Sequence, residues 1–326
     1  MQPQLLSFIL MATTLAFGPP AAARALSLDD VNKAELARTA RKHPSAVNVR
    51  AQVLLDRANF SPGVIDGRRS DNFTNALRAF QQKNGLDAGG ELDHATWKKL
   101  TESPEPALIP YTINAADLKG PFVDKVPDDY EKKAELHRLD FTGPVELLAE
   151  RFHMDETLLR QLNPGQAFDR AGTVIVVANV NVKPVALNAG AVKLEVDKTR
   201  NAVRVLAGDG KLLAAYPASI GSAEKPAPSG RLKVVRIARS PTYTYNPDFK
   251  FRGVRADREL KIAAGPNNPV GSVWIALSEK TYGIHGSAEP HKVGKVSSHG
   301  CVRMTNWDAL AVAGFVRKGT VVEFVE

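Results

Sequence analysis

The sequence predicts a multidomain α+β protein in which a mainly β C-terminal domain, a β-sandwich or open barrel, follows a small three-helix bundle and a small α/β module. Its 326 residues exceed what one hydrophobic core usually organises, so two or three domains are expected. Apolar residues recur at helical spacing over residues 49–100, whereas short alternating runs bounded by turn residues dominate residues 192–326. Two proline-containing stretches, 101–110 and 181–191, are therefore predicted to be linkers.

Residues 1–25 are predicted to be a signal peptide. A short apolar run from Leu5 to Phe17 precedes two prolines and several small residues, and Ala23-Arg24-Ala25 supplies an A-x-A cleavage site. No Lys or Arg precedes the run, so an uncleaved anchor stays an alternative. No later stretch has the roughly 18 apolar residues that a membrane helix needs, so we expect no stable membrane span after cleavage. Residues 26–48 form an N-terminal segment, with a short polar helix expected from Leu28 to Ala40.

Charge and cysteine content narrow the class of protein. The net charge of +8 and the pI near 9.5 favour a polyanionic partner. The Lys and Arg residues are rarely interleaved with aromatic residues, so we expect no nucleic-acid partner. Cys301 is the single cysteine, and in an exported protein a leftover thiol is intermolecular, buried or reactive.

Residues 49–100 are predicted to fold as helix, turn and helix. Their pattern resembles the small three-helix peptidoglycan-binding domain, through Gly63-x-Ile65-Asp66-Gly67, Thr74-x-Ala76, Phe80-Gln81, Gly85-Leu86, Asp93 and Thr96-Trp97. The resemblance implies binding to the cell wall. The alternative is a helical bundle that has kept no ligand.

Residues 111–180 are predicted to form two helices and a final strand, Thr173 to Val177, after an Asn163-Pro164-Gly165 turn. With a first strand at Tyr111-Thr112-Ile113, this order is similar to the LysM glycan-binding module. About thirty residues separate that strand from the first helix, where the family has a short turn. We therefore interpret the block as a degenerate LysM-like module.

Residues 192–326 are predicted to open as a β-meander, because Asp209-Gly210 is a hairpin dipeptide between alternating apolar runs. Trp274 to Leu277 and Val321 to Val325 are expected to be late core strands. Trp307 to Val316 has the apolar spacing of a helix.

The densest group of reactive residues lies in this domain, at Ile284-His285-Gly286-Ser287 and Ser297-Ser298-His299-Gly300-Cys301-Val302-Arg303-Met304. A thiol is a nucleophile only as its thiolate, so it needs a nearby base or cation, and histidines precede it. Glycine lets the backbone approach a substrate and present its amides. The pattern favours cysteine-dependent catalysis over a buried cysteine. The pattern also favours cysteine-dependent catalysis over a zinc site. The candidate ligands would be His285, His291, His299 and Cys301, but they do not have the usual spacing of zinc ligands.

These residues resemble the L,D-transpeptidase catalytic domain, or YkuD family, whose signature is an upstream H-G followed by S-H-G-C-x-R. The resemblance covers about 135 residues, from Val192 to Glu326. Further blocks that match are Pro217-x-Ser219-x-Gly221, Pro228-Ser229-Gly230, Gly265-Pro266-Asn267-Asn268-Pro269-Val270-Gly271, Tyr282-Gly283 and Asn306-Trp307-Asp308.

The resemblance implies a role for each signature residue. Cys301 is the nucleophile, His285 its base, and the Gly286 carbonyl orients the imidazole. Arg303 is predicted to bind a substrate carboxylate. The supporting or oxyanion positions are Gly286, Ser298, His299 and Gly300. No metal and no cofactor are implied.

The implied reaction acylates Cys301 with a peptidoglycan tetrapeptide stem, expels the terminal D-alanine and transfers the acyl group to an acceptor amine. The acceptor could be another stem, giving a 3→3 cross-link, or the lysine of a wall-anchored lipoprotein. Transfer to water would make the protein a hydrolase, and a dormant site would leave a peptidoglycan-binding structural protein. Export and substrate together predict the periplasm or cell wall.

Overall fold

The computed structural model describes residues 26–37, 43–180, 192–222, 225–249, 256–298 and 300–326. The predicted signal peptide and the predicted 181–191 linker lie outside these ranges. None of the helices within them is both long and apolar enough to cross a membrane.

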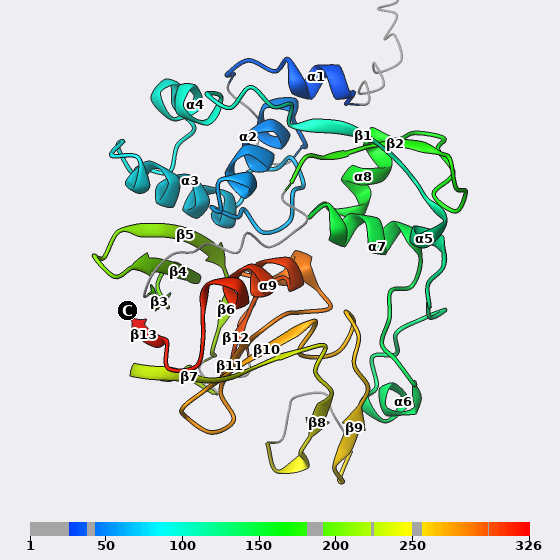
Figure 1. Cartoon of the computed structure of the whole chain (residues 1–326), viewed down its shortest axis with the longest axis vertical. Helices are drawn as coiled ribbons and strands as arrows, with labels where there is room; N and C mark the ends of the chain where they lie inside the picture. The colour runs from blue at the N-terminus through cyan, green and yellow to red at the C-terminus, as the bar shows by residue number, and fades with distance from the viewer. Residues whose placement is uncertain (1–25, 38–42, 181–191, 223–224, 250–255, 299) are drawn as a thin grey trace, which may run out of the picture.

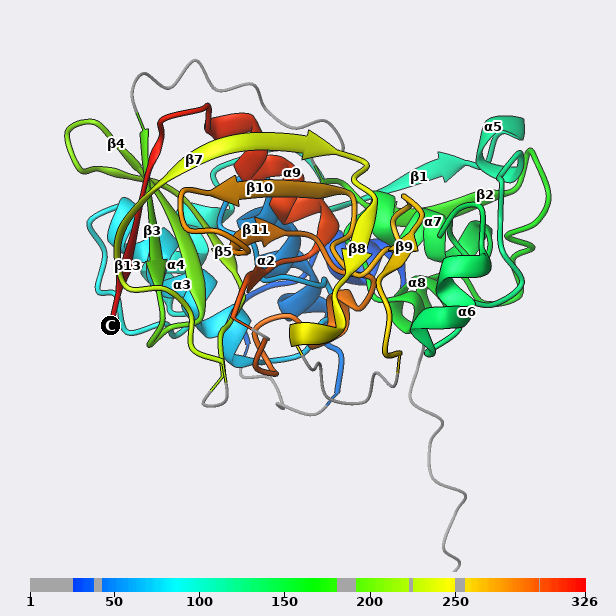
Figure 2. The same cartoon turned by 90° about the horizontal axis from the view of Figure 1, so that it is seen from below.

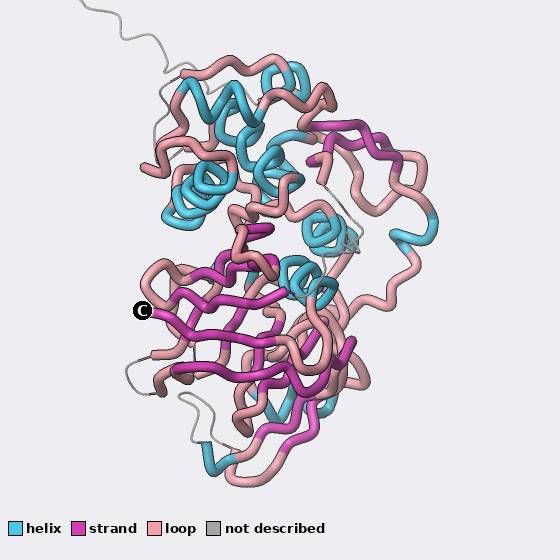
Figure 3. Tube along the Cα trace, turned by 60° about the vertical axis from the view of Figure 1, so that its left-hand side comes forward, coloured by secondary structure: helices cyan, strands magenta, loops and turns pink. Residues whose placement is uncertain are grey.

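Helices occupy the N-terminal part of the molecule (Figures 1 and 3). They are α1 (Leu28–Asn32), α2 (Ala46–Arg57), α3 (Asp71–Lys83) and α4 (His94–Leu100). Each begins after a polar residue whose side chain accepts a hydrogen bond from a first-turn amide, which satisfies a donor that the helix leaves unpaired. The four capping residues are Ser27, Ser45, Ser70 and Asp93.

The helix expected from Leu28 to Ala40 is wrong in length, because α1 ends at Asn32. The Asn32 side chain bonds to both backbone groups of Leu108, and Arg50 donates to the Ala34 carbonyl at 2.7 Å. These tertiary contacts hold the chain in a non-helical path directly after the first turn.

A two-stranded antiparallel ribbon follows, formed by β1 (Leu108–Thr112) and β2 (Val174–Ala178). Between them lie α7 (Pro144–Arg151) and α8 (Glu156–Leu162), in the predicted order of strand, helix, helix and strand. β1 starts within the stretch predicted to be a linker, and Pro110 pairs with Val176. A proline is tolerated here because a strand of a two-stranded ribbon has an edge that needs no amide donor.

The thirty residues that depart from the LysM pattern form an excursion along one side of the molecule (Figure 1). They contain α5 (Ala115–Leu118) and α6 (Tyr130–Glu135). α6 packs against β9 (Leu260–Ile262), which pairs with β8 (Tyr243–Tyr245). The N-terminal half thus contacts the C-terminal domain through α6 and β9.

The described C-terminal residues form a nine-stranded sheet with the order β5-β4-β3-β13-β7-β10-β11-β12-β6. Two short 3-10 helices, η1 (Pro247–Phe249) and η2 (Pro290–Lys292), lie in its connections. Its strands are β3 (Val192–Asp197), β4 (Ala202–Ala207), β5 (Leu212–Pro217), β6 (Ser219–Ile220), β7 (Gly230–Arg239), β10 (Val273–Leu277), β11 (Gly283–His285), β12 (Val302–Arg303) and β13 (Val321–Val325).

This sheet is nearly closed. The outermost strands in its order, β5 and β6, are consecutive in the chain, and only Ala218 separates them. Figure 2 shows β3, β4 and β5 crossing steeply over the direction of β7 and β10. Helix α9 (Asn306–Phe315) packs against β10 and β11 on one face. The predicted β-rich, barrel-like domain is therefore confirmed.

The modules share hydrophobic cores. Val49 and Val53 of α2 pack into the core of the β1–β2 module, whereas Ala51 and Leu55 pack into the helical core. The helical core also includes Leu206, Leu212 and Ala215 from β4 and β5. Apolar burial of this kind stabilises a fixed arrangement of the three parts.

Candidate active site

Pairing of β11 with β12 places the strand that ends at His285 beside the strand that follows Cys301. The two strands are parallel, with Ile284 opposite Val302 and His285 opposite Arg303. Side chains alternate along a strand, and directly paired residues point to the same face. Cys301 lies in the turn directly before β12, one residue from Val302, which pairs with Ile284 next to His285.

The imidazole of His285 is held in one tautomer. Its Nδ1 lies 2.7 Å from the Gly286 carbonyl oxygen, which can only accept, so Nδ1 carries the proton and Nε2 is left as an acceptor. The Trp274 ring stacks on the imidazole with centroids 5.4 Å apart. Burial first, and then the positive charge of Arg303, lowers the pKa of His285 to about 3. The imidazole is therefore neutral near pH 7.

The thiol of Cys301 is half-buried, with Sγ 3.6 Å from the Thr281 carbonyl oxygen. Burial raises the pKa of this thiol. The Gly283 backbone and the charges of Lys225 and Arg303 act in the opposite direction. The resting pair is a neutral thiol and a neutral imidazole, which suits proton removal during attack rather than a preformed ion pair.

The turn before Cys301 has a defined construction. Ser298 donates its hydroxyl to the Cys301 carbonyl at 2.5 Å, and its amide donates to Gly221 at 2.9 Å. Since the Ser298 hydroxyl proton is used within the turn, the side chain supports the turn. Gly300 has φ +98°, a conformation that L side chains rarely adopt. His299 lies outside the described residues.

Arg303 supplies positive charge beside the pair. It is half-buried, and no acidic side chain of the described residues forms an ion pair with it. Its charge lowers the pKa of both His285 and Cys301. This arrangement leaves the guanidinium available for the carboxylate-binding role predicted for it.

Several contributors to the site had no signal in the local sequence. Lys225 comes from the connection between β6 and β7, and a Cβ on Gly300 would lie 3.1 Å from its Cγ. Tyr130 of α6 packs edge-on against Tyr243 and Tyr245, with centroids 6.2 and 5.5 Å apart. Burial is the main cause that raises the pKa of Tyr243.

Asn306 supports the site from behind, where it begins α9. Its Oδ1 accepts from the Ser272 amide at 2.9 Å, and its Nδ2 donates to Glu150 of α7 at 3.0 Å. A Cβ on Gly286 would lie 2.1 Å from that Oδ1, so the amide lies directly against the residue that orients His285. Burial raises the pKa of Glu150 to about 7.

A thiol before β12, a base-competent imidazole on the paired strand β11, two cations whose charge acts on the thiol and a glycine turn have the composition of a cysteine-dependent acyl-transfer site. Residues 191–324 match the family model described as "L,D-transpeptidase catalytic domain" (YkuD), and residues 49–100 match "Putative peptidoglycan binding domain". The chain belongs to the YkuD-type L,D-transpeptidase family and carries an N-terminal domain of the peptidoglycan-binding type. The predicted resemblances to these two families are confirmed, and the LysM-like interpretation of residues 111–180 stays a prediction.

Curated relatives have the same family name. The chain is 28% identical over 180 residues to "Putative L,D-transpeptidase YkuD" of Bacillus licheniformis, spanning 55% of this chain and 91% of that protein. It is 31% identical over 133 residues to "Putative L,D-transpeptidase YqjB" of Bacillus subtilis, spanning 39% of this chain and 67% of that protein. The crystal structure of L,D-transpeptidase 3 from Mycobacterium tuberculosis in complex with a faropenem-derived adduct matches with a TM-score of 0.35 and 19% identity, covering 42% of this chain and 60% of that one.

Proposed function

We propose that the protein is an exported cysteine L,D-transpeptidase that acylates Cys301 with a peptidoglycan tetrapeptide stem and transfers the acyl group to an acceptor amine. The observation that carries the proposal is the His285 tautomer. With Nδ1 bound to the Gly286 carbonyl, Nε2 is left to accept the Cys301 proton.

The chemistry follows from these positions. As Sγ attacks the carbonyl of the third stem residue, its proton passes to Nε2 of His285, and the carbonyl oxygen becomes an oxyanion. Backbone amides of Gly300 and Cys301 are the proposed donors to that oxyanion. The imidazolium then protonates the leaving D-alanine nitrogen, and a thioester remains on Cys301. An acceptor amine attacks the thioester, gives its proton to His285 and restores the thiol.

Compartment and partners belong to the same proposal. The apolar run of residues 5–17 supports export, and the peptidoglycan-binding-type domain supports a location in the periplasm or cell wall. Acceptors consistent with the chemistry are the side-chain amine of another stem and the lysine of a wall-anchored lipoprotein.

The test is intact-mass spectrometry of the mature protein incubated with disaccharide-tetrapeptide, with chromatography of the products. We expect an adduct at Cys301, loss of alanine and dimeric muropeptides. Cys301→Ala and His285→Ala should show no adduct, whereas His291→Ala, a matched change at an exposed histidine, should react as the native protein does. Tripeptide as the sole product would replace transfer by hydrolysis, and binding without adduct or product would sink the enzyme proposal.

A further inference from the structure

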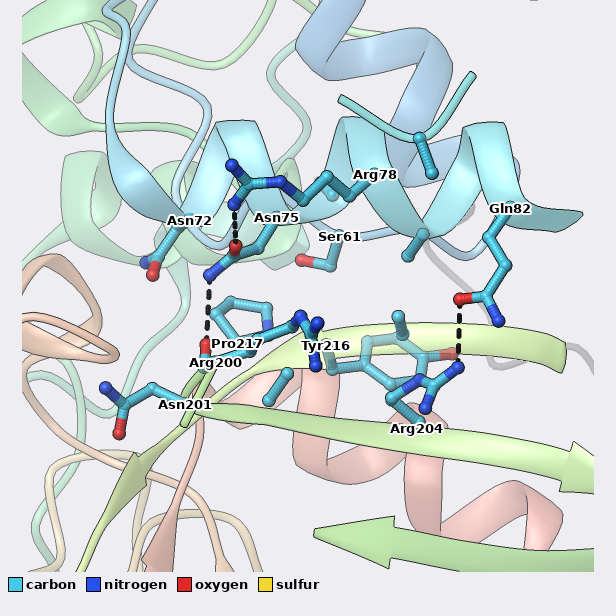
Figure 4. Close-up of a pocket in the computed structure, with 15 residues that line it drawn as sticks. Ser61, Asn72, Asn75, Arg78, Gln82, Arg200, Asn201, Arg204, Tyr216 and Pro217 are labelled. Carbon is cyan, nitrogen blue, oxygen red and sulfur yellow. Dashed lines mark hydrogen bonds between the residues drawn. The ribbon is translucent and has the colours of Figure 1, made fainter. Parts of the chain in front are cut away.

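A cavity of about 220 Å³ lies between helix α3 and strands β4 and β5, where the peptidoglycan-binding-type domain meets the catalytic domain (Figure 4). Neither Cys301 nor His285 lines it. The described polar residues that line it are three arginines, four side-chain amides, a serine and a tyrosine: Arg78, Arg200, Arg204, Asn72, Asn75, Gln82, Asn201, Ser61 and Tyr216.

The charged side chains among the described residues that line this cavity are all positive. No Asp or Glu is among the described residues that line it. Behind the lining, Arg200 pairs with Asp197 at 2.9 Å and Arg204 pairs with Glu195. Within the described part of the chain, Arg78 has no ion pair; its Nη1 donates to the Asn75 oxygen at 3.1 Å. Of the three arginines, Arg78 is therefore the one whose charge is not paired with a carboxylate of the described residues.

Arg78 is held in place before any ligand arrives. Its stem lies against Gly90, where an added Cβ would approach the Arg78 Cγ to 2.8 Å. Asn75 accepts from Arg78 and also donates across the cavity to the Arg200 carbonyl at 2.9 Å. Figure 4 shows this chain of bonds linking α3 to the opposite wall. Preorganisation of this kind lowers the entropy that a ligand must give up on binding.

The walls come from both domains, so the cavity exists only in the docked arrangement. Gln82 of α3 accepts from Arg204 of β4 at 3.0 Å, and Ser61 donates to Asp308 of α9 at 3.0 Å. The Asn72 amide donates to the Val293 carbonyl at 2.9 Å, in the segment that leads to Ser298 and Cys301. A ligand seated here would contact the wall-binding and catalytic domains at once.

We infer that this cavity binds a carboxylate-bearing residue of a peptidoglycan stem peptide, separate from the stem that acylates Cys301. The guanidinium of Arg78 pairs with a carboxylate through its planar fork, and the surrounding amides match the donors and acceptors of a peptide backbone. The volume is below the 300–1,000 Å³ typical of whole-ligand sites, so it suits one residue of the stem. The identity of the ligand rests on the proposed function.

The test uses the single cysteine to separate the two sites. The mature protein is alkylated at Cys301 with N-ethylmaleimide, and its binding of disaccharide-tetrapeptide is measured by calorimetry. Arg78→Gln should weaken binding about tenfold, as expected for loss of one charged hydrogen-bonded pair. Lys83→Gln removes one charge from the exposed end of the same helix and should leave the affinity unchanged.

A second ligand identifies the group that is bound. The same disaccharide-tetrapeptide with its carboxyls amidated should bind the native protein about tenfold more weakly and should not distinguish it from Arg78→Gln. Equal weakening by Arg78→Gln and Lys83→Gln, or equal affinity for free and amidated ligand, would overturn the inference. Tight binding of peptide-free glycan chains that depends on Arg78 would also overturn it.

Adduct formation distinguishes failure of the proposed function from failure of the inference about the cavity. Without alkylation, Arg78→Gln should still form the Cys301 adduct at the native rate when substrate is saturating, which also shows that the variant is folded. Absence of adduct in both native and variant proteins would count against the transpeptidase proposal and not against the cavity. Arg78→Lys keeps the positive charge but loses the planar fork of the guanidinium. We expect the affinity of this variant for disaccharide-tetrapeptide to lie between those of the native protein and Arg78→Gln.

Discussion

Replacing Asp308 by asparagine should stabilise the protein, and more so at alkaline than at acid pH. Asp308 lies in α9 at the junction of the three parts, is 2% exposed, and accepts from Ser61 at 3.0 Å. Burial first, and then the nearby charge of Asp56, raises the pKa of Asp308 from 3.8 to about 7. His153, which pairs with Asp56 at 3.0 Å and stacks on Trp307, acts in the opposite direction.

The sign follows from proton uptake. Between pH 4 and pH 7 the folded protein keeps the Asp308 proton that the unfolded chain has already lost, so the free energy of unfolding falls as pH rises. Two pH units between 5 and 7, at about 1.4 kcal/mol per unit, amount to about 3 kcal/mol. Asparagine has nothing to titrate, so the advantage of Asp308→Asn should be about 3 kcal/mol larger at pH 8.5 than at pH 5.

The assay is urea unfolding at both pH values, followed by tryptophan fluorescence because Trp307 is adjacent in the sequence. Asp87→Asn removes an exposed carboxylate and should track the native protein at both pH values. The quantity compared is the difference in free energy of unfolding between Asp308→Asn and the native protein. If that difference is the same at pH 5 and pH 8.5, or smaller at pH 8.5, the reasoning from burial is refuted.

Three further predictions concern the reactive pair. Gly300→Ala places a methyl group 3.1 Å from Lys225 in a strained backbone. The rate of Cys301 acylation, measured by adduct formation, should fall at least about a hundredfold. The thermal midpoint, measured by circular dichroism, should change little. Lys225→Gln removes a charge that lowers the pKa of Cys301, so the pH profile of iodoacetamide alkylation should move to higher pH; an unmoved profile would exclude that influence. Trp274→Ala removes the ring stacked on His285 and admits water, so the pKa of His285 should rise from about 3 toward 6.5. The pH below which the acylation rate falls should therefore move to a higher value.

The local sequence identified the elements whose signals are short in range. Caps such as Ser45 and Ser70 begin helices where the 3.6-residue period starts, and the helix predicted from Trp307 to Val316 is found one residue earlier. The spacing of His285, Gly300 and Cys301 was enough to predict a catalytic thiol, because each residue type has a chemical property that few others share.

Boundaries were less predictable where a distant contact decided them. β1 begins at Leu108 inside an apparent linker because Asn32 and β2 satisfy its backbone. α1 stops early for the same kind of reason. Partners 76 residues apart leave no trace in a local pattern.

The sequence by itself determined the family and the β-rich character of the catalytic domain, and it predicted the thiol and the imidazole of the site, since these depend on residue type and short periodicity. Only the tertiary structure decided the protonation of the pair, which depends on burial by Trp274 and on the charge of Arg303. It also decided that α2 serves two cores and that Arg78 faces Arg200 across a cavity. Burial and electrostatics arise between residues far apart in the chain, so their effects exist only once the chain has folded.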